Sequence, residues 1–560
     1  MMSRRQTTCL LVAALLVGAP ALATRAASPG LALLKTDDFR EWLTYIASDQ
    51  LQGRATFSAG LGLAAAYVED HLRAWGVQPA GDDGSYLQTV LVEGIKATSR
   101  SSVIVQVGNE SRTFRDGDGV TFPRFSGGKQ SVTLDRVEFT GYALDVPAIG
   151  HVDLRGRNLA GAAVVWLGQN GPRGFDAQLY RTLLAYRDRY VTDGLQAGAL
   201  IGPDRAPAAR SAGALSQDRG PGVMPDFTTS RRLDLPRTPT VTGSDTFYSF
   251  LFSKAPIRYE ELKRRADAQD VLPEFTLSGV RITFNVDMEY DVVRTQITQN
   301  VVGIVQGTDP ALRSTYVAFG AHYDHLGYSE AASGSSGAPA PPPFAVASPT
   351  ASPADRIWNG ADDDGSGTVA LMGLARAFAE GPRPRRSLLF VWHTGEELGT
   401  YGSLYFVDHP TVPIGAIVAQ LNIDMIGRNR NDEPSEGNTV YLVGSDRIST
   451  ELDDISRDAD SALPAPLTLD YAMNDLSDPE QIYYRSDHYS YAAKGIPIIF
   501  FTTGLHADYH AATDEVSRIL FDKLTKVAAL VYETGTRVAN LDHAPVRDNQ
   551  GARAGKGTRQ

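Results

Sequence analysis

Five short segments in the second half of the chain concentrate histidines and acidic residues. They are residues 320–325, 359–367, 393–397, 422–425 and 506–510. The chain's single cysteine is Cys9, so a metal ion bound by these segments must be held by imidazoles and carboxylates. Such a donor set suits zinc better than magnesium or calcium, which prefer shells made only of oxygen atoms. The chemistry it indicates is hydrolysis assisted by metal ions.

Each segment taken alone has an ordinary structural explanation. Acidic turns often cap helices, paired glutamates often face solvent, and a single histidine is more often a hydrogen-bonded polar residue than a ligand. Position favours the functional interpretation, because all five segments would bring acids and imidazoles to one place. That many acids would repel one another and raise each other's pKa unless cations lay between them.

The elements that would position these residues are buried strands. Continuous apolar runs at 316–319, 388–392, 416–419 and 496–501 indicate strands covered on both faces. A helix with Leu371, Leu374 and Phe378 on one side lies between the first two, and a last helix spans 520–531. This order predicts an α/β fold with a mixed, mainly parallel sheet sandwiched by helices. The binding site of such a sheet lies beyond the carboxyl ends of its strands, where the five segments fall.

Changes in texture along the chain predict its division into domains. Residues 36–97 are expected to form a helical N-terminal part of the main domain, with a helix around Leu61–Trp75 that Gly76 ends. Residues 98–290 have short strand-like pieces between turns and predict a smaller β-rich inserted domain. Residues 291–540 complete the main domain. Residues 329–355 and the tail 541–560 are expected to be flexible.

The N-terminus predicts export. Arg4 and Arg5 precede an apolar run that closes on Ala21-Leu22-Ala23, the order of a signal peptide over residues 1–23. The run is shorter than the ~20 residues that a membrane-spanning helix needs. We therefore expect a periplasmic or extracellular protein with no membrane association after cleavage. The net charge of −12 weighs against nucleic-acid partners, and the sequence does not indicate the oligomeric state.

The five segments together resemble a known enzyme family. Their sequences GAHYDHLG, NGADDDGSG, HTGEELG, NIDMIG and YHAATDE occur in the order found in the co-catalytic di-zinc exopeptidases. These enzymes are related to bacterial leucyl aminopeptidase, aminopeptidase Y, glutamate carboxypeptidase and glutaminyl cyclase. The resemblance covers residues 296–540 and 36–95, and residues 98–290 resemble the protease-associated domain inserted in many relatives.

The resemblance implies a pair of zinc ions per chain. His322 and Asp424 would bind one ion, Glu397 and His510 the other, and Asp363 would bridge them. Asp363 is chosen over its two acidic neighbours because the family ligand is the second acid of the triplet.

The resemblance also implies catalytic roles. Glu396 would be the general base that takes a proton from a water shared by the ions. Tyr509 resembles the phenol that hydrogen-bonds the developing oxyanion in some relatives, although a packing tyrosine is nearly as plausible. Asp324 would accept the second ring N–H of His322, or it would simply cap a turn.

Four further polar residues are expected near the same edge, and three histidines are expected to have structural roles. The loops that carry Arg428, Arg485, Asp487 and His488 are predicted to lie near the site. The remaining histidines His325, His409 and His543 are taken as structural.

The sequence thus predicts a secreted zinc aminopeptidase that acts on peptide substrates. The acidic edge favours action at the N-terminus of the substrate, because it would attract the substrate's ammonium group. A carboxypeptidase would need an arginine to bind the substrate's carboxylate. The alternatives are a carboxypeptidase or dipeptidase, a glutaminyl cyclase on the same site, or a binding protein that has lost catalysis.

Overall fold

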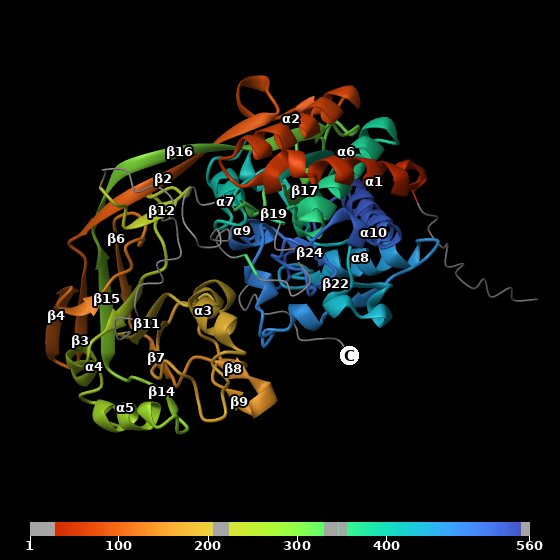
Figure 1. Cartoon of the computed structure of the whole chain (residues 1–560). Coiled ribbons are helices and arrows are strands. Elements are labelled where there is room, and N and C mark those ends of the chain that lie inside the picture. Colours follow the sequence, from red (N-terminus) through yellow and green to blue (C-terminus); the bar gives the residue numbers. More distant parts are fainter. Residues whose placement is uncertain (1–27, 205–222, 330–344, 347–354, 550–560) are drawn as a thin grey trace, which may run out of the picture.

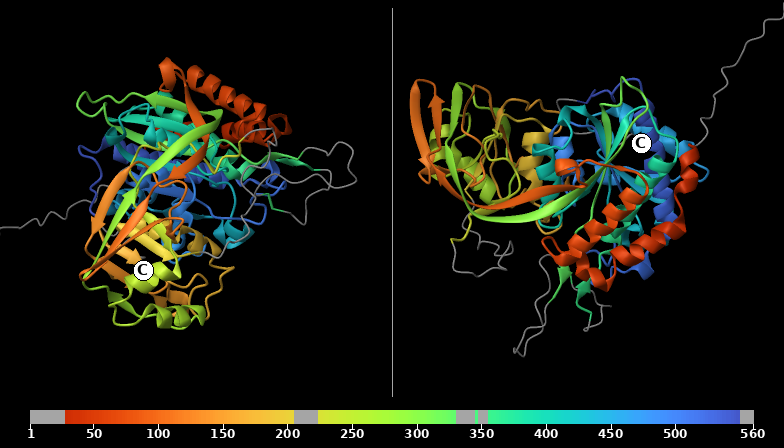
Figure 2. Two further views of the ribbon diagram at one scale, coloured as in Figure 1. Left: turned by 90° about the vertical axis from the view of Figure 1, so that its left-hand side faces the viewer. Right: turned by 90° about the horizontal axis from the view of Figure 1, so that it is seen from above.

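Two lobes joined by a pair of long strands make up the computed structural model, which describes residues 28–204, 223–329, 345–346 and 355–549 (Figure 1). Strands β2 (Leu87–Ser99) and β16 (Met288–Val305) pair in antiparallel fashion from Met288↔Ser99 to Val301↔Leu87. They leave the first lobe side by side and carry the chain into and out of the second lobe, as the views in Figure 2 also show. The expected signal peptide and most of the expected loop 329–355 lie outside the described residues.

A mixed sheet forms the centre of the first lobe. Its strand order is β12-β2-β16-β20-β17-β21-β24-β22-β23, and β1 pairs with β16. The four central strands β20 (Ser387–His393), β17 (Tyr316–His322), β21 (Ile417–Ile423) and β24 (Ile498–Thr502) are parallel. Antiparallel pairs flank them on both sides. The outer strands are β1 (Gln78–Pro79), β12 (Phe227–Thr229), β22 (Thr439–Val443) and β23 (Thr468–Asp470).

Helices cover both faces of this sheet, which confirms the predicted α/β sandwich. One face packs against α1 (Thr36–Ile46), α2 (Ala59–Ala74), α6 (Gly367–Glu380), α8 (Thr450–Ser461) and α10 (Phe521–Asn540). The other packs against α7 (Tyr401–Asp408) and α9 (His488–Ala493). Side chains of β20 alternate between the two cores: Leu388 and Phe390 point to the first, and Leu389 and Val391 to the second. Burial on both faces is why this strand is continuously apolar.

The N-terminal part differs in one respect from the sequence prediction. Helix α2 forms as expected: Oγ of Ser58 accepts a hydrogen bond from the Leu61 amide at its start, and Gly76 follows its end with φ +72°. The prediction that helical structure extends to residue 95 is wrong, since these residues belong to β2. Val90 and Val92 are buried while their neighbours are partly exposed, a period of two that belongs to a strand.

The second lobe has its own sheet and core. The strand order is β14-β7-β10-β11-β13-β5-β4-β3-β15-β6, and aromatic and aliphatic side chains such as Phe139, Phe247 and Ile282 are fully buried beneath it. Three helices accompany the sheet: α3 (Arg181–Arg189), α4 (Asp245–Leu251) and α5 (Tyr259–Asp267). The strands are β3 (Ser102–Val107), β4 (Glu110–Asp116), β5 (Gly119–Thr121), β6 (Gln130–Leu134), β7 (Val137–Thr140), β10 (Ala163–Val165), β11 (Ala199–Pro203), β13 (Thr240–Gly243), β14 (Glu274–Thr276) and β15 (Val280–Val286).

Two short hairpins complete the described strands. Strands β8 (Asp145–Val146) and β9 (His151–Val152) pair within the second lobe. Strands β18 (Gly327–Tyr328) and β19 (Ile357–Trp358) pair in the first lobe, at the two ends of the expected flexible loop.

The lobes contact each other through α3 and the turn that follows it. Nη1 of Arg189 donates a hydrogen bond of 3.0 Å to the Tyr484 carbonyl, and the ring of Tyr186 stacks on that of Tyr484. The Tyr489 hydroxyl on α9 donates to Asp193. The second lobe therefore touches the layer of the first lobe that contains α9.

Part of the expected flexible tail is held against α8. The Asp548 carboxylate accepts hydrogen bonds from the amide and hydroxyl of Thr450, and the Asn549 amide donates to the Ile448 carbonyl. Residues 550–560 lie outside the described residues. Within the described ranges, none of the helices combines the length and apolar character that crossing a membrane requires.

Candidate metal centre

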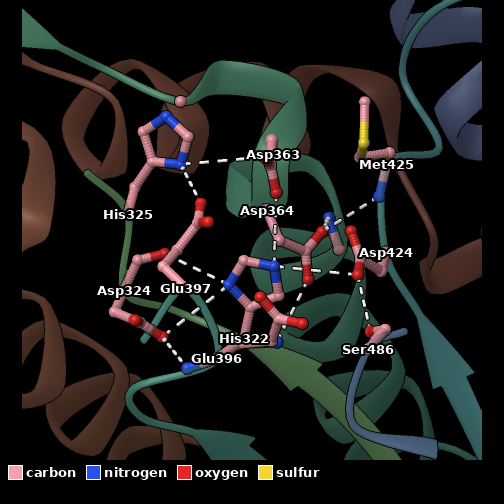
Figure 3. A network of polar contacts seen from close by, with 12 residues as sticks. His322, Asp324, His325, Asp363, Asp364, Glu396, Glu397, Asp424, Met425 and Ser486 are labelled. Atoms are coloured by element: carbon pink, nitrogen blue, oxygen red, sulfur yellow. Dashed lines mark hydrogen bonds and ion pairs between the residues drawn. The ribbon is translucent and has the colours of Figure 1, made fainter. Parts of the chain in front are cut away.

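The carboxyl ends of the central parallel strands bring the sequence-predicted ligands together, and Figure 3 labels all of them except His510. His322 is the last residue of β17, and Asp424 directly follows β21. Glu397 lies just beyond β20, and His510 lies in the segment after β24. Asp363 comes from a π-helical turn (Ala361–Ser366) that leads into α6. Because parallel strands end at the same edge, residues far apart in sequence meet there.

Asp363 occupies the middle of the group. Its Oδ1 lies 3.3 Å from Nε2 of His322, which is also 3.7 Å from Oδ2 of Asp424. Its Oδ2 lies 3.2 Å from Nε2 of His510, which is 3.1 Å from Oε2 of Glu397. The two oxygens of one carboxylate therefore face two separate groups of ligand atoms, which is the arrangement that a bridging ligand needs.

His325, which the sequence analysis took as structural, also lies in this site. Its Nδ1 is 2.7 Å from Oε1 of Glu397 and 3.9 Å from Oδ2 of Asp363, and its side chain is fully buried. His322, Asp363 and Asp424 form one group whose ligand atoms all lie within 4.8 Å of one another, and His325, Asp363 and Glu397 form a second. His325 belongs to the same segment as His322, so its place after a strand end was a usable signal.

The three consecutive acids of residues 362–364 have different surroundings. Asp364 accepts hydrogen bonds from the backbone amides of His322, Gly367 and Met425, so it ties two strand ends to the start of α6. Oδ1 of Asp362 accepts from the Gly427 amide. Backbone amides thus bind both outer acids, although Oδ2 of Asp362 lies 3.3 Å from Nε2 of His506, while the middle acid keeps its oxygens for the site.

The backbone of the triplet is fixed from a further segment. The buried carboxylate of Asp514 accepts hydrogen bonds from the amides of Asp362 and Asp363. This acid belongs to the YHAATDE segment, which was predicted only to supply His510. One segment therefore delivers a candidate ligand and also positions the turn that carries the candidate bridge.

These residues fit divalent metal ions. Oδ2 of Asp363 and Oε1 of Glu397 are buried and accept no hydrogen bond from the described residues, although imidazole nitrogens lie close to them. Although burial opposes its charged form, Glu397 and Asp363 raise the pKa of His510 to about 11. Without a metal ion, protonated imidazoles would have to balance these carboxylates. A cation held between nitrogen and oxygen lone pairs would do so with all of the donors deprotonated.

Glu396, the predicted base, lines a small cavity of about 50 Å³ together with His322, Asp363 and Asp424. Burial raises the pKa of the Glu396 carboxyl well above its ordinary value, although the neighbouring His322 opposes this. The carboxylate is next to a candidate ligand in sequence, and it is free to face the cavity.

Asp324 is fully buried, and its carboxylate accepts hydrogen bonds from other donors than the predicted ring N–H of His322. Nδ1 of His322 lies 3.2 Å from the Asp324 backbone carbonyl and 3.7 Å from Oδ1 of its carboxylate, so the carbonyl is the nearer acceptor. The carboxylate accepts hydrogen bonds from the Glu396 amide at 3.1 Å and from the Thr56 hydroxyl at 2.9 Å. Asp324 therefore positions the backbone of Glu396, and its carbonyl orients the ring of His322.

Tyr509 and Arg485 line the same cavity as Glu396. Nη2 of Arg485 donates a hydrogen bond of 2.9 Å to the Tyr509 hydroxyl, and Nη1 pairs with Glu480 at 3.0 Å. The Tyr509 ring stacks on that of His510, with centroids 3.9 Å apart. A cation beside the phenol leaves its hydroxyl hydrogen free to donate into the cavity.

The other residues predicted near this edge lie outside the cavity. Arg428 is paired with Asp432 and Asp508, and Nε2 of His488 contacts the Tyr483 carbonyl. Asp487 is fully buried behind the site, where burial raises the pKa of its carboxyl to about 7. His409 stacks on Tyr405 away from the site, and His543 pairs with Asp542 and Glu451 on the surface.

The sequence analysis did not identify Arg54, which connects the N-terminal part to the site. Its guanidinium is fully buried and donates to the backbone carbonyls of Ile46, Tyr323, Asn359 and Gly360. It therefore holds the turn after β17 against the start of the acidic turn. No motif in the sequence marks this residue, because its partners are backbone atoms.

The chain is similar to known proteins. The model of peptidase family M28 matches residues 300–535. A protein of Aspergillus oryzae described as probable leucine aminopeptidase 2 is 26% identical over 306 residues, which are 50% of this chain and 52% of that protein. A probable glutamate carboxypeptidase of Arabidopsis thaliana is 28% identical over 177 residues, 31% of this chain and 19% of that protein.

The chain is also similar to a solved structure of BSAP, a zinc aminopeptidase from Bacillus subtilis. The aligned part covers 92% of this chain and 98% of the BSAP chain, with 16% identity and a TM-score of 0.43. The chain spans only 6% to 52% of the lengths of the curated relatives it matches. Strand ends, acidic turn and candidate base all fall within the matched range. Residues 300–535 of the chain therefore match the peptidase family M28 model over the region that holds the candidate site.

Proposed function

We propose that the protein is an exported zinc-dependent exopeptidase, and specifically an aminopeptidase that removes residues from the free N-terminus of peptides. The observation that carries the proposal is the carboxylate of Asp363, whose two oxygens face two groups of ligand atoms beside Glu396. A pair of zinc ions held by His322, Asp363, Asp424, Glu397 and His510 would polarise the scissile carbonyl and make a water molecule acidic enough to attack it. The signal-like residues 1–23 support export to the periplasm or the extracellular space.

The side chains of this chain have distinct tasks in that reaction. Glu396 takes the proton of the attacking water and passes it to the leaving amine, because its carboxylate lines the cavity without being committed to another donor. Asp324 holds the Glu396 backbone in place through the hydrogen bond to its amide. Tyr509 donates its hydroxyl proton as a hydrogen bond to the oxygen on which negative charge develops.

The cavity also supports a preference for the substrate. The carboxylates that line it favour the ammonium group of a free N-terminus. Part of its wall is apolar and suits an aliphatic or aromatic first side chain. The apolar lining residues are Met425, Met473, Ile482, Phe500 and Leu505.

One observation favours carboxypeptidase activity as a second candidate. Arg485 lies in the same cavity, and a guanidinium is the group that binds a substrate carboxylate well. Against this, both of its terminal nitrogens already have partners, Tyr509 and Glu480. We therefore rank the aminopeptidase first.

The direct test is hydrolysis of leucine and alanine anilides by the purified protein, before and after chelation. We expect turnover that chelation abolishes and zinc restores, with metal analysis giving close to a pair of ions per chain. Turnover that is indifferent to chelation would contradict the proposal. A metal content below one ion per chain would favour a binding protein without catalysis.

A pair of blocked peptides separates the exopeptidase alternatives. We expect a C-amidated peptide to be cleaved from its N-terminus and an N-acetylated peptide to resist cleavage. The reverse pattern would identify a carboxypeptidase. Release of ammonia from peptides with N-terminal glutamine, without loss of a residue, would identify a cyclase.

A further inference from the structure

A second cavity, of about 420 Å³, lies between the two lobes and shares no lining residue with the candidate metal centre. The second lobe contributes the end of α3 and residues around 122–126 and 231–240. The first lobe contributes α7 and α9, including Tyr489 and Lys494. The wall is rich in cationic side chains: Arg189, Arg231, Arg232, Arg237 and Lys494.

Three of these cations form no ion pair with a described residue: Arg189, Arg231 and Arg237. Arg189 donates to the Tyr484 carbonyl, which leaves two guanidiniums without a polar partner among the described residues. The guanidiniums of Arg231 and Arg237 form no ion pair with any described residue, and Arg237 instead lies over the face of the Phe125 ring at 4.3 Å. By contrast, Arg232 is held by Asp234 and Lys494 by Asp408, at 2.5 and 2.6 Å. Within the cavity wall, Arg231 and Arg237 therefore differ from Arg232 and Lys494 in lacking a carboxylate partner.

The acidic groups nearest to these two arginines are engaged elsewhere. Asp193 accepts hydrogen bonds from the hydroxyls of Tyr489 and Thr192. Asp408 accepts from Lys494 and from the Arg232 amide. Neither carboxylate can move to Arg231 or Arg237 without leaving another donor unpaired.

Like charges in this cavity repel one another. Burial, and after it the nearby charges of Arg237 and Arg189, lower the pKa of Arg231 to about 10. The pKa of Arg237 is also lowered, first by burial, while Asp193 partly opposes the shift. A guanidinium in a partly buried position needs an anion with oxygen acceptors, and its planar fork matches carboxylate and phosphate groups.

We propose that this cavity binds a small oxyanion, a molecule bearing a carboxylate or phosphate group, between the guanidiniums of Arg231 and Arg237. The volume accommodates a small metabolite, and Phe125 and Tyr489 provide aromatic walls beside the charged group. Because residues from both lobes line it, the bound anion stabilises the contact between them. The site does not depend on the proposed peptidase function.

Thermal unfolding and calorimetric titration of the full chain with inorganic phosphate or succinate test this site, with sodium chloride keeping the ionic strength constant. We expect both techniques to detect binding, with an unfolding temperature at least about 2 °C higher at saturation. Arg231→Gln and Arg237→Gln each remove a charge-assisted hydrogen bond and weaken the binding about tenfold. The matched control Arg232→Gln binds like the unaltered chain, since Arg232 is already paired with Asp234. Comparing the two probes shows whether the site prefers phosphate or carboxylate.

One further measurement keeps the test decisive. Phosphate could also bind at the metal centre, so only binding that depends on Arg231 or Arg237 counts, and Asp363→Asn must retain it. In chloride buffer alone, Arg231→Gln should unfold at the same or a higher temperature than the unaltered chain, because it removes a repelling charge. The proposal would be overturned if both arginine variants bound the anion as tightly as the unaltered chain. It would also be overturned if phosphate and succinate changed the unfolding temperature no more than chloride does.

Discussion

The candidate metal centre and the cavity between the lobes both bury like charges, but they are built differently. In the metal centre, acids gather at the ends of parallel strands, and Asp364 and Asp514 bind backbone amides that fix its geometry. In the cavity, cations come from α3 and from the segment 231–240 that precedes β13. One cluster is held by backbone hydrogen bonds at a sheet edge, and the other depends on how two lobes meet.

This difference indicates which kind of occupant each cluster suits. Two ligand groups, each with its ligand atoms within 4.8 Å of one another and supported by a rigid edge, fit small cations of fixed geometry. A larger cavity with two unpaired guanidiniums fits an anion of less exact shape. Arg54 differs from these two arginines. Its guanidinium is also buried, but it donates hydrogen bonds to four backbone carbonyls and therefore needs no bound anion.

The largest effect is expected for Glu396→Gln. Loss of the base should lower kcat on a leucine anilide by about 10²–10⁴-fold while the bound metal stays unchanged. The control Glu433→Gln, at an exposed glutamate of the same lobe, should keep its activity. Steady-state kinetics with metal analysis on the same samples measures both. Activity within twofold of the unaltered enzyme would remove Glu396 from the mechanism.

The next largest effect is expected for Arg54→Met. The substitution removes four hydrogen bonds and leaves the carbonyls of Ile46, Tyr323 and Asn359 without a donor, while the Gly365 amide still donates to Gly360. It should therefore lower the free energy of unfolding by at least about 3 kcal/mol. Arg281→Met is the control, because Arg281 is exposed and pairs only with Asp135, and it should stay within about 0.5 kcal/mol. Urea unfolding measures both. Equal stability of the two variants would mean that charge burial alone does not distinguish these arginines.

Metal removal should destabilise the chain by a smaller amount. Chelation leaves the carboxylates of the centre to repel one another, so the unfolding temperature should fall by several degrees, and zinc should reverse the fall. In Asp363→Asn, both ligand groups lose a carboxylate oxygen, and zinc should no longer raise the unfolding temperature. Scanning calorimetry with and without chelator measures this. Unchanged stability on chelation would indicate that the acidic cluster needs no cation.

The smallest effect is an expected absence of coupling between the two clusters. Asp363→Asn and Arg237→Gln share no contact, so the changes that they cause in the free energy of unfolding should add within about 0.5 kcal/mol in the double variant. Chemical unfolding of the single and double variants, followed at one pH and ionic strength, gives the coupling. A larger value would mean that the lobes transmit a change from one site to the other.

Much of the site could be predicted because its support is a sheet edge. All candidate ligands except Asp363 lie at or after the end of an apolar run, and parallel strands bring such positions together whatever the intervening chain does, as His322 and Asp424 show. His325 was missed although it lies in the same segment as His322, because only one histidine of that segment was assigned as a ligand. Arg54 was missed because its partners are backbone carbonyls, which leave no trace in residue types.

The prediction from sequence was also wrong for local elements where the apolar residues were compatible with either a helix or a strand. Residues 87–95 were assigned to a helical region, although they form the strand that leads into the second lobe. The pairing partner of that strand, β16, lies about two hundred residues later in the chain, so only the tertiary contact stabilises it. The helices of the second lobe were likewise absent from the prediction of a β-rich domain.

The sequence by itself determined the α/β class and the kinds of ligand atom available, because apolar runs and residue types are local properties. The tertiary structure decided that the Asp324 carboxylate supports Glu396, that His325 joins the second ligand group, and that unpaired arginines meet between the lobes. Those outcomes depend on distances between segments that are remote in sequence, and such distances are fixed only when the sheet, its helices and the second lobe pack together.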